Sequence, residues 1–329
     1  MVSEFRRSCT SDLTGIWQIE AYLHTAENLM RLRNNFVGLE HDKWGRITFG
    51  MDDSPYRKHR NKLDIFRDTI ASSNNIIGTH LVSNDIDGDG NADNSEIGAD
   101  VMMPKRNFDE RPSNLITYQT PKFHGFQGLV ARESLSRPED DSDDEYEGFG
   151  GLITYDRKPY YAAMVYEMWE GDGNRNATGR DKVDAWSVAC GYTFSNRFGN
   201  SDIRFLYEDI DHGESDSTMS RDAFWAALSH RIGANEFKIT YAAADDSEAG
   251  AGNDGAENLS ISIDHHFSNR TRVYAIYTHM DNDENANYGL FKQDNTSLGA
   301  SSGINSFYAH TGENGQNLDA ISLGIVHVF

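Results

Sequence analysis

Long hydrophobic runs are absent from this sequence of 329 residues. No stretch approaches the ~18 apolar residues that a membrane-spanning helix needs, which excludes helical membrane proteins. Basic residues are also few, because 30 Lys and Arg stand against 52 Asp and Glu and give a net charge of −22. Nucleic-acid partners are therefore not expected, since they require a basic face. The two cysteines, Cys9 and Cys190, give no basis for predicting a disulfide.

Apolar residues instead recur at every second position over short segments. In Asp184–Phe194 the large side chains share one parity, which begins at Trp186, and small residues occupy the other. Glu257–Phe267 repeats this pattern, and so does the final segment, Asp319–Phe329. Successive side chains of a strand point to opposite faces, so each segment predicts a strand with one apolar face. Six prolines and 29 glycines are the balance expected for strands and turns.

About fourteen such strands are predicted along the chain, and their connections alternate between tight and long. Residues 157–159 and 233–235 form tight connections, whereas 134–146 and 281–316 are long and polar. This alternation is typical of outer-membrane barrels. The predicted strands are Leu13–Tyr22, Met30–Leu39, Arg46–Met51, Asn114–Thr120, Gln127–Glu133, Phe149–Tyr155, Tyr160–Trp169, Asp184–Phe194, Ile203–Glu208, Arg221–Ile232, Glu236–Ala243, Glu257–Phe267, Arg272–Met280 and Asp319–Phe329.

The second parity of these strands distinguishes two all-β fold classes. A β-sandwich shares the alternation, but both of its inner faces must supply a core. Here the second parity carries Ser, Thr, Gly, Ala, Asp, Arg and His, which predicts a water-filled interior and favours a transmembrane antiparallel β-barrel. We therefore expect a single barrel domain over residues 13–329. Residues 1–12 contain no hydrophobic run of the kind found in a signal peptide, and we expect them to be an atypical leader.

The segment 52–113 is too long and too weakly periodic for a simple strand connection, and loops of this size are usually functional or disordered. Its centre has the sequence D-I-D-G-D-G-N-A-D-N-S-E. This spacing fits a calcium-binding loop with Gly90 at the sharp turn. The flanking helices of a full EF-hand are not evident, so an acidic surface turn is the alternative. The expected ligands of a structural Ca²⁺ are Asp85, Asp87, Asp89, Asn91, Asp93 and Glu96.

Three further motifs lie outside this centre. They are R-N-N-F-V-G-L-E-H-D-K-W-G-R-I-T-F-G-M-D-D-S-P-Y at Arg33–Tyr56, K-L-D-I-F-R-D-T at Lys62–Thr69 and R-P-S-N-L-I-T-Y-Q-T-P-K-F-H-G-F at Arg111–Phe126. Together with the terminal strand that ends in Phe329, these short motifs are spread in order along most of the chain. On these motifs the chain resembles the general-diffusion porins of Gram-negative bacteria, of the type found in Neisseria and Burkholderia.

The resemblance implies a 16-stranded barrel in the outer membrane, a homotrimer surrounded by outer-membrane lipid, and a third outer loop folded into the lumen as the constriction. The segment Ile16–Glu20 resembles the family's third strand, so two strands and a signal peptide are expected to be missing, as in a truncated chain. Phe329 is expected to be the assembly signal of the barrel.

In a pore of this kind, charges at the narrowest part set the ion selectivity. Loop carboxylates are expected to face wall arginines across the constriction. Where family members often have arginines on the strand that enters the loop, this chain has Thr48 and Met51, so we expect a preference for cations. The candidate residues are Asp52, Asp53, Asp64, Asp68, Asp109 and Glu110 on the loop and Arg31, Arg33 and Arg111 on the wall.

The function that these expectations imply is passive diffusion of small hydrophilic solutes and ions, with no required cofactor. Enzyme chemistry is not expected, because the carboxylates are so numerous that no pair stands out as an acid–base couple. A substrate-selective channel is one alternative. An outer-membrane adhesin is another, since its function would lie in long outer loops such as Asp281–Gln316.

Overall fold

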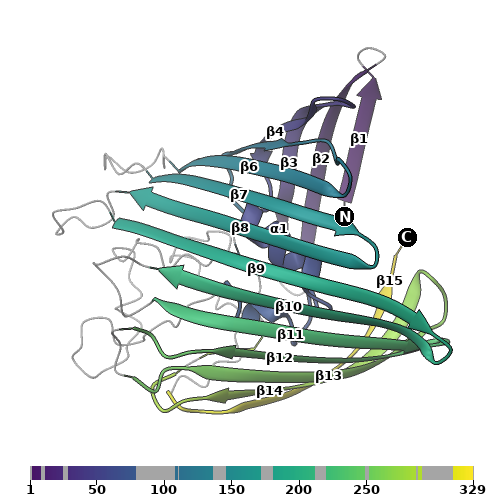
Figure 1. Ribbon diagram of the computed structural model, residues 1–329, viewed down its shortest axis with the longest axis vertical. Coiled ribbons are helices and arrows are strands. Elements are labelled where there is room, and N and C mark those ends of the chain that lie inside the picture. The colour runs from purple at the N-terminus through teal and green to yellow at the C-terminus, as the bar shows by residue number, and fades with distance from the viewer. Residues whose placement is uncertain are drawn as a thin grey trace.

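The computed structural model describes residues 2–8, 12–24, 29–78, 108–109, 111–135, 146–171, 181–211, 220–248, 252–286, 288–290 and 314–328. These residues form one strongly curved antiparallel sheet of fifteen strands, in which every strand pairs with its neighbours in sequence (Figure 1). The strands are β1 Val2–Ser8, β2 Leu13–His24, β3 Leu29–His41, β4 Gly45–Met51, β5 Leu115–Gln119, β6 Phe126–Leu135, β7 Tyr146–Arg157, β8 Tyr160–Gly171, β9 Asp181–Asn196, β10 Gly199–Asp211, β11 Arg221–Ile232, β12 Asn235–Ala244, β13 Ala256–His266, β14 Thr271–Asn282 and β15 Leu318–His327.

The two faces of the sheet differ as the alternation predicts. On β13, Leu259, Ile261 and Ile263 are exposed on the outer face, whereas Ser260 and Ser262 are buried on the inner face. A soluble protein rarely leaves so many large apolar side chains exposed, but lipid covers them in a membrane barrel. The predicted fold class, an all-β transmembrane barrel sheet, is therefore confirmed.

The first strand corrects the expectation for residues 1–12. Strand β1 pairs with β2 in register, and the Phe5 and Trp17 rings stack with their centroids 5.3 Å apart. Val2–Ser8 thus belongs to the sheet and not to a leader outside it. The described residues therefore contain one strand more than the fourteen predicted.

The sheet is not closed. All neighbouring strands are antiparallel, so β1 and β15 run in the same direction. No ladder joins these two strands among the residues that the structure describes. Antiparallel closure of a barrel needs an even number of strands, and the described sheet has an odd number.

The connections alternate in length as predicted. Residues 158–159 join β7 to β8 and residues 233–234 join β11 to β12, whereas 52–114 separate β4 from β5 and 283–317 separate β14 from β15. The tight connections lie at one end of the sheet, which we call the short-turn end (at the right in Figure 1).

Outer-face aromatic rings gather near the short-turn end. The ring centroids of Tyr160 and Tyr192 are 5.4 Å apart, and those of Phe126 and Tyr155 are 4.8 Å apart. A belt of aromatic residues at this level is the usual mark of a membrane interface on a barrel.

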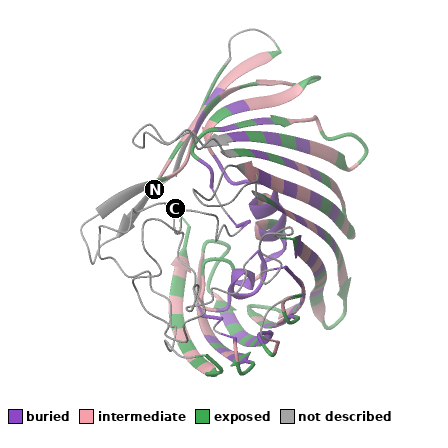
Figure 2. Ribbon diagram, turned by 90° about the vertical axis from the view of Figure 1, so that its left-hand side faces the viewer, coloured by how far each residue is buried: buried purple, intermediate pink, exposed green. Residues whose placement is uncertain are grey.

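The chain after β4 begins with segment 52–78, which lies against the inner face of the sheet (Figure 2). It contains helix α1, Pro55–Leu63, and the short 3₁₀ helix η1, Ser73–Asn75. The Ser54 hydroxyl accepts a hydrogen bond from the Arg57 N–H at 3.1 Å and so caps α1. Pro55 favours a helix start as well. This helix is not among the elements predicted from the sequence, although Ser54 followed by Pro55 signals it. No helix within the described ranges is long and apolar enough to cross a membrane.

Segment 52–78 fills part of the interior. Leu63 and Ile76 belong to a buried apolar cluster with Trp225 of β11. Nearby on the inner face, Ser260 of β13 and Thr278 of β14 are also buried, and their hydroxyl oxygens lie 2.8 Å apart. The polar inner face of the sheet is thus accessible to water over only part of its area. This corrects the expectation that the polar residues of every strand face water. Polar groups in the covered part pair with each other instead.

Candidate pore constriction

Helix α1 has three faces, and the first packs on the wall of the sheet. Tyr56, His59 and Leu63 share this face because residues three and four apart lie on one side of a helix. His59 Nε2 lies 3.1 Å from the hydroxyl of Ser187 on β9, and that hydroxyl donates to the carbonyl of Tyr207 at 2.7 Å. The imidazole Nε2–H is therefore the donor to Ser187. Burial lowers the pKa of His59 to about 3, so the ring is neutral.

One wall carboxylate binds segment 52–78 near both of its ends. Glu208 of β10 is fully buried and accepts hydrogen bonds from the Tyr56 hydroxyl and from the Gly78 N–H, the latter at 2.8 Å. Arg221 of β11 donates to Glu208 at 3.1 Å and to the carbonyl of Ile76 at 2.7 Å. The buried pair Glu208–Arg221 therefore fixes this segment to two neighbouring strands.

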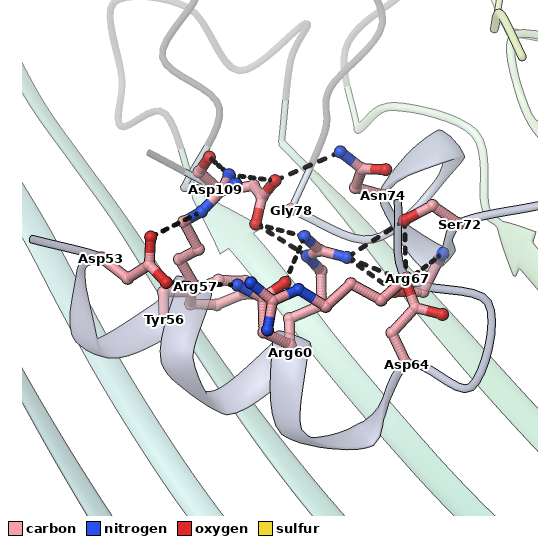
Figure 3. Close-up of polar contacts among 12 residues, drawn as sticks. Asp53, Tyr56, Arg57, Arg60, Asp64, Arg67, Ser72, Asn74, Gly78 and Asp109 are labelled. Carbon is pink, nitrogen blue, oxygen red and sulfur yellow. Dashed lines mark hydrogen bonds and ion pairs between the residues drawn. The ribbon is translucent and has the colours of Figure 1, made fainter. Parts of the chain in front are cut away.

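The second face of α1 carries Arg57 and Arg60, and both bind Asp109 on the returning chain (Figure 3). Arg57 Nη1 and Arg60 Nη2 each lie 2.7 Å from a different carboxylate oxygen of Asp109. Arg60 also lies 3.2 Å from Asp64, one helical turn further along. All four side chains are buried, so the two guanidinium groups are shared among carboxylates in a site with little water.

Asp53 extends this cluster toward β5. The Nε atoms of Arg111 and Arg57 lie 2.9 Å and 3.0 Å from the same oxygen of Asp53. Burial raises the pKa of the Asp53 carboxyl, but these two guanidinium groups outweigh it and hold the pKa below its usual value. With Asp64, Asp109 and Arg60 included, three carboxylates are balanced by three arginines.

The third face of α1 carries lysines and is wet. Lys58 Nζ lies 2.5 Å from Asp52, and Lys62 Nζ lies 3.2 Å from Asp156 of β7. Lys122, in the turn between β5 and β6, lies 3.8 Å from the same oxygen of Asp156. These three lysines line a cavity of about 190 Å³ between α1 and the inner face of β5–β8. The lysine side chains therefore lie where a solute in the lumen would meet them.

The structure brings five of the predicted constriction residues together, but in another arrangement. Asp52, Asp53, Asp64 and Asp109 bind cations of α1, and Arg111, shortly before β5, binds Asp53. The expected polarity was an acidic loop against a basic wall. In the described residues α1 is basic and contacts carboxylates on β7, β8 and β10. One wall arginine also reaches the helix, because Arg204 of β10 donates to the carbonyl of Leu63 at 2.7 Å and to that of Lys62 at 3.2 Å.

The remaining predicted residues do not join this cluster. The Asp68 side chain is 66% exposed and lies 3.5 Å from its neighbour Arg67. Arg33 of β3 pairs with Glu20 of β2 at 3.1 Å. Several predictions fall outside the described residues and are untested by the structure. They concern Glu110, the side chain of Arg31, the calcium loop from Asp85 to Glu96, and Phe329.

Sequence reasoning missed several residues of the site. Glu208 and Glu167 stand at the small and polar parity of their strands, so each was expected to point into the interior, and this placement was the available signal. Glu167 accepts a hydrogen bond from the Tyr56 N–H at 3.0 Å. Lys58 and Lys62, four residues apart, would have been recognised once the helix was predicted.

Comparisons with known proteins agree with this fold. A family model described as Gram-negative porin matches residues 11–285. An anion-selective porin from Comamonas acidovorans has a similar structure, with a TM-score of 0.72, 17% identity, and coverage of 99% of this chain and 88% of that one.

Two more solved structures are similar. OmpF of Salmonella typhi in complex with daunomycin gives a TM-score of 0.65 at 12% identity, covering 99% of this chain and 88% of OmpF. The trimer form of OmpT from Vibrio cholerae gives 0.59 at 11% identity, covering 99% and 90%. At these identities the likeness shows the fold alone. No curated protein sequence matches the chain.

Proposed function

Because this chain belongs to the Gram-negative porin family, we propose that small hydrophilic solutes and ions diffuse passively through it, without turnover chemistry. It is an outer-membrane porin channel. The observation that best supports the proposal is the contrast between the two faces of each strand, with apolar side chains outside and polar side chains inside. A wet path through such a sheet needs no cofactor to operate.

We propose that the channel is a homotrimer, because the similar OmpT of Vibrio cholerae has a trimer form. Recording from the purified protein in a planar lipid bilayer tests the channel and the trimer together. A conducting trimer should close in three equal steps. Equal closures in another number would contradict the trimer, and a silent protein that has inserted would instead favour an adhesin.

We propose that segment 52–78, with Asp109 and Arg111, forms the constriction. This proposal is supported by its position on the inner face and by its anchor at Glu208. Cysteine substitution at the exposed Lys62, followed by reaction with a bulky thiol reagent, should lower the conductance by about half or more if the segment narrows the pore. The same reaction at Trp44, which is exposed in the turn between β3 and β4, is the control.

We propose that the channel prefers cations because of the net charge of the whole chain, and not because wall arginines are missing at the constriction. The five described loop carboxylates are paired with cations, so they provide little net field. The net charge of −22 then acts at long range, and salt screens it beyond about 10 Å at 0.1 M. The reversal potential in a potassium chloride gradient should favour K⁺ most at low salt. A preference for chloride at every salt concentration would refute it.

A structural Ca²⁺ in the loop Asp85–Glu96 is proposed from its ligand spacing alone. Isothermal titration of the folded protein with Ca²⁺ should release or absorb heat. The variant Glu96→Gln, which removes the bidentate ligand, should weaken this binding by about tenfold or more. Absence of heat with the unmodified protein would exclude the site.

A further inference from the structure

The cavity beside α1 has an excess of positive charge. Lys58, Lys62 and Lys122 line it together with a single carboxylate, Asp156. Lys58 is already paired with Asp52 at 2.5 Å, which leaves two lysines for the one remaining acid. Asp156 can neutralise only one of these two lysines. By this count the cavity carries about one net positive charge.

The two lysines at Asp156 are loosely held. Lys62 Nζ and Lys122 Nζ lie 3.2 Å and 3.8 Å from the same carboxylate oxygen, and their side chains are 56% and 49% exposed. Exposed pairs of this kind contribute little to stability and exchange partners readily. Both ammonium groups are therefore available to another anion that enters the cavity.

Neutral donors surround these lysines. The amide side chains of Gln119 and Gln127 line the same cavity. Tyr161 lines it as well, and its buried hydroxyl has no hydrogen-bond partner among the described residues. Lysine ammonium groups act on phosphate as point charges, and amide and hydroxyl donors add directional hydrogen bonds. The donor set suits a small oxyanion with several acceptor oxygens.

We infer that this cavity is a binding subsite for small oxyanions, of the class of inorganic phosphate, within the diffusion path. The inference rests on the proposed function, because the subsite matters only if solutes pass α1. The cavity volume of about 190 Å³ far exceeds the ~10–15 Å³ that a single water occupies, so a small hydrated anion fits. A basic subsite is compatible with a cation preference that arises from the acidity of the whole chain.

Planar-bilayer recording with inorganic phosphate as the probe tests the subsite. In potassium chloride, phosphate should reduce the single-channel current of the unmodified protein in a saturable manner. The variant Lys62→Gln/Lys122→Gln should raise the half-effect concentration about fivefold, and Asp156→Asn should lower it. All three side chains are more than a third exposed, so these variants are expected to fold.

A matched control removes two cations from the outer face. Arg132 of β6 and Lys182 of β9 are exposed and pair with Glu147 and Asp184, so Arg132→Gln/Lys182→Gln gives the same change in net charge outside the lumen. This control should respond to phosphate as the unmodified protein does. Equal effects of the two double variants would overturn the subsite, as would an unmodified channel that conducts but shows no saturable block. A protein that forms no channel would instead refute the proposed function.

Discussion

The arginine face and the lysine face of α1 pair with carboxylates at similar distances, yet they differ in burial. Arg57 and Arg60 lie 2.7 Å from Asp109 in a buried cluster, whereas Lys62 lies 3.2 Å from Asp156 beside an open cavity. The planar guanidinium group satisfies several acceptors in fixed directions, and the flexible ammonium group remains hydrated. Burial therefore decides whether an ion pair of α1 stabilises the fold or remains available to a solute.

The largest effect is expected from removing the shared carboxylate of the arginine face. Asp109→Ala leaves two buried guanidinium groups without their common partner and should lower the free energy of unfolding by ~3–5 kcal/mol. Urea unfolding of the folded protein in detergent measures it. Asp68→Asn is the control, because its side chain is 66% exposed and Asn tolerates the left-handed backbone at this position (φ 61°), so stability should change by less than ~0.5 kcal/mol. Equal losses of stability for the two variants would contradict the claim that burial makes the Asp109 ion pairs structural.

The buried wall pair gives a second, somewhat smaller effect. Glu208→Gln keeps the shape of the side chain but leaves Arg221 without a countercharge, which should cost about 3 kcal/mol. Arg221→Gln should cost about as much. The double variant should cost clearly less than the sum, with a coupling of ~2 kcal/mol, because neither charge is then left alone. Additive losses in a double-mutant cycle would show that the two residues do not act as a pair.

His59 allows a test of burial by pH. Its folded pKa of about 3 lies below the usual 6.5, so the unfolded state binds the proton first as the pH falls. Stability is therefore full above about pH 6.5 and is lost progressively toward pH 3. Between pH 7 and pH 5, protonation of this one residue in the unfolded state should lower the free energy of unfolding by about 2 kcal/mol.

The variant His59→Gln should remove that part of the pH dependence. His265→Gln is the control, since His265 is exposed on the outer face of β13. Free energies of unfolding measured at pH 7 and pH 5 for the unmodified protein and the two variants test this prediction. If His59→Gln keeps the full slope, another group titrates in this window.

The sequence predicted the strands because lipid imposes a simple rule on them. Every second residue must be apolar, as in Leu259, Ile261 and Ile263, and the polar alternate positions then identify the inner face. Strand β1 escaped because Phe5 is the single aromatic residue in V-S-E-F-R-R-S, and its partner Trp17 becomes evident only once the two strands pair. The alternation within a segment is thus sufficient to predict a strand whose own outer face contacts lipid.

The constriction was less predictable because its charges pair over long distances in the sequence. Asp53 and Asp109 were identified as loop carboxylates, but their partners Arg57 and Arg60 lie on a helix that was not predicted. Without the helical spacing, the acids appeared available to face a basic wall. The charge that the site presents depends on which side chains of α1 face the carboxylates. The amino-acid composition alone does not determine which side chains these are.

The smallest effect on stability is expected at the lysine face, and it sharpens the comparison most. A double-mutant cycle between Lys62→Gln and Asp156→Asn should give a coupling below ~1 kcal/mol, because the side chains are 56% and 37% exposed and water competes with the pair. Urea unfolding at low and high salt measures it, and the coupling should shrink further as salt is added. A coupling as large as that of Glu208 and Arg221 would mean that Lys62 is structural, and the contrast between the two faces of α1 would then fail.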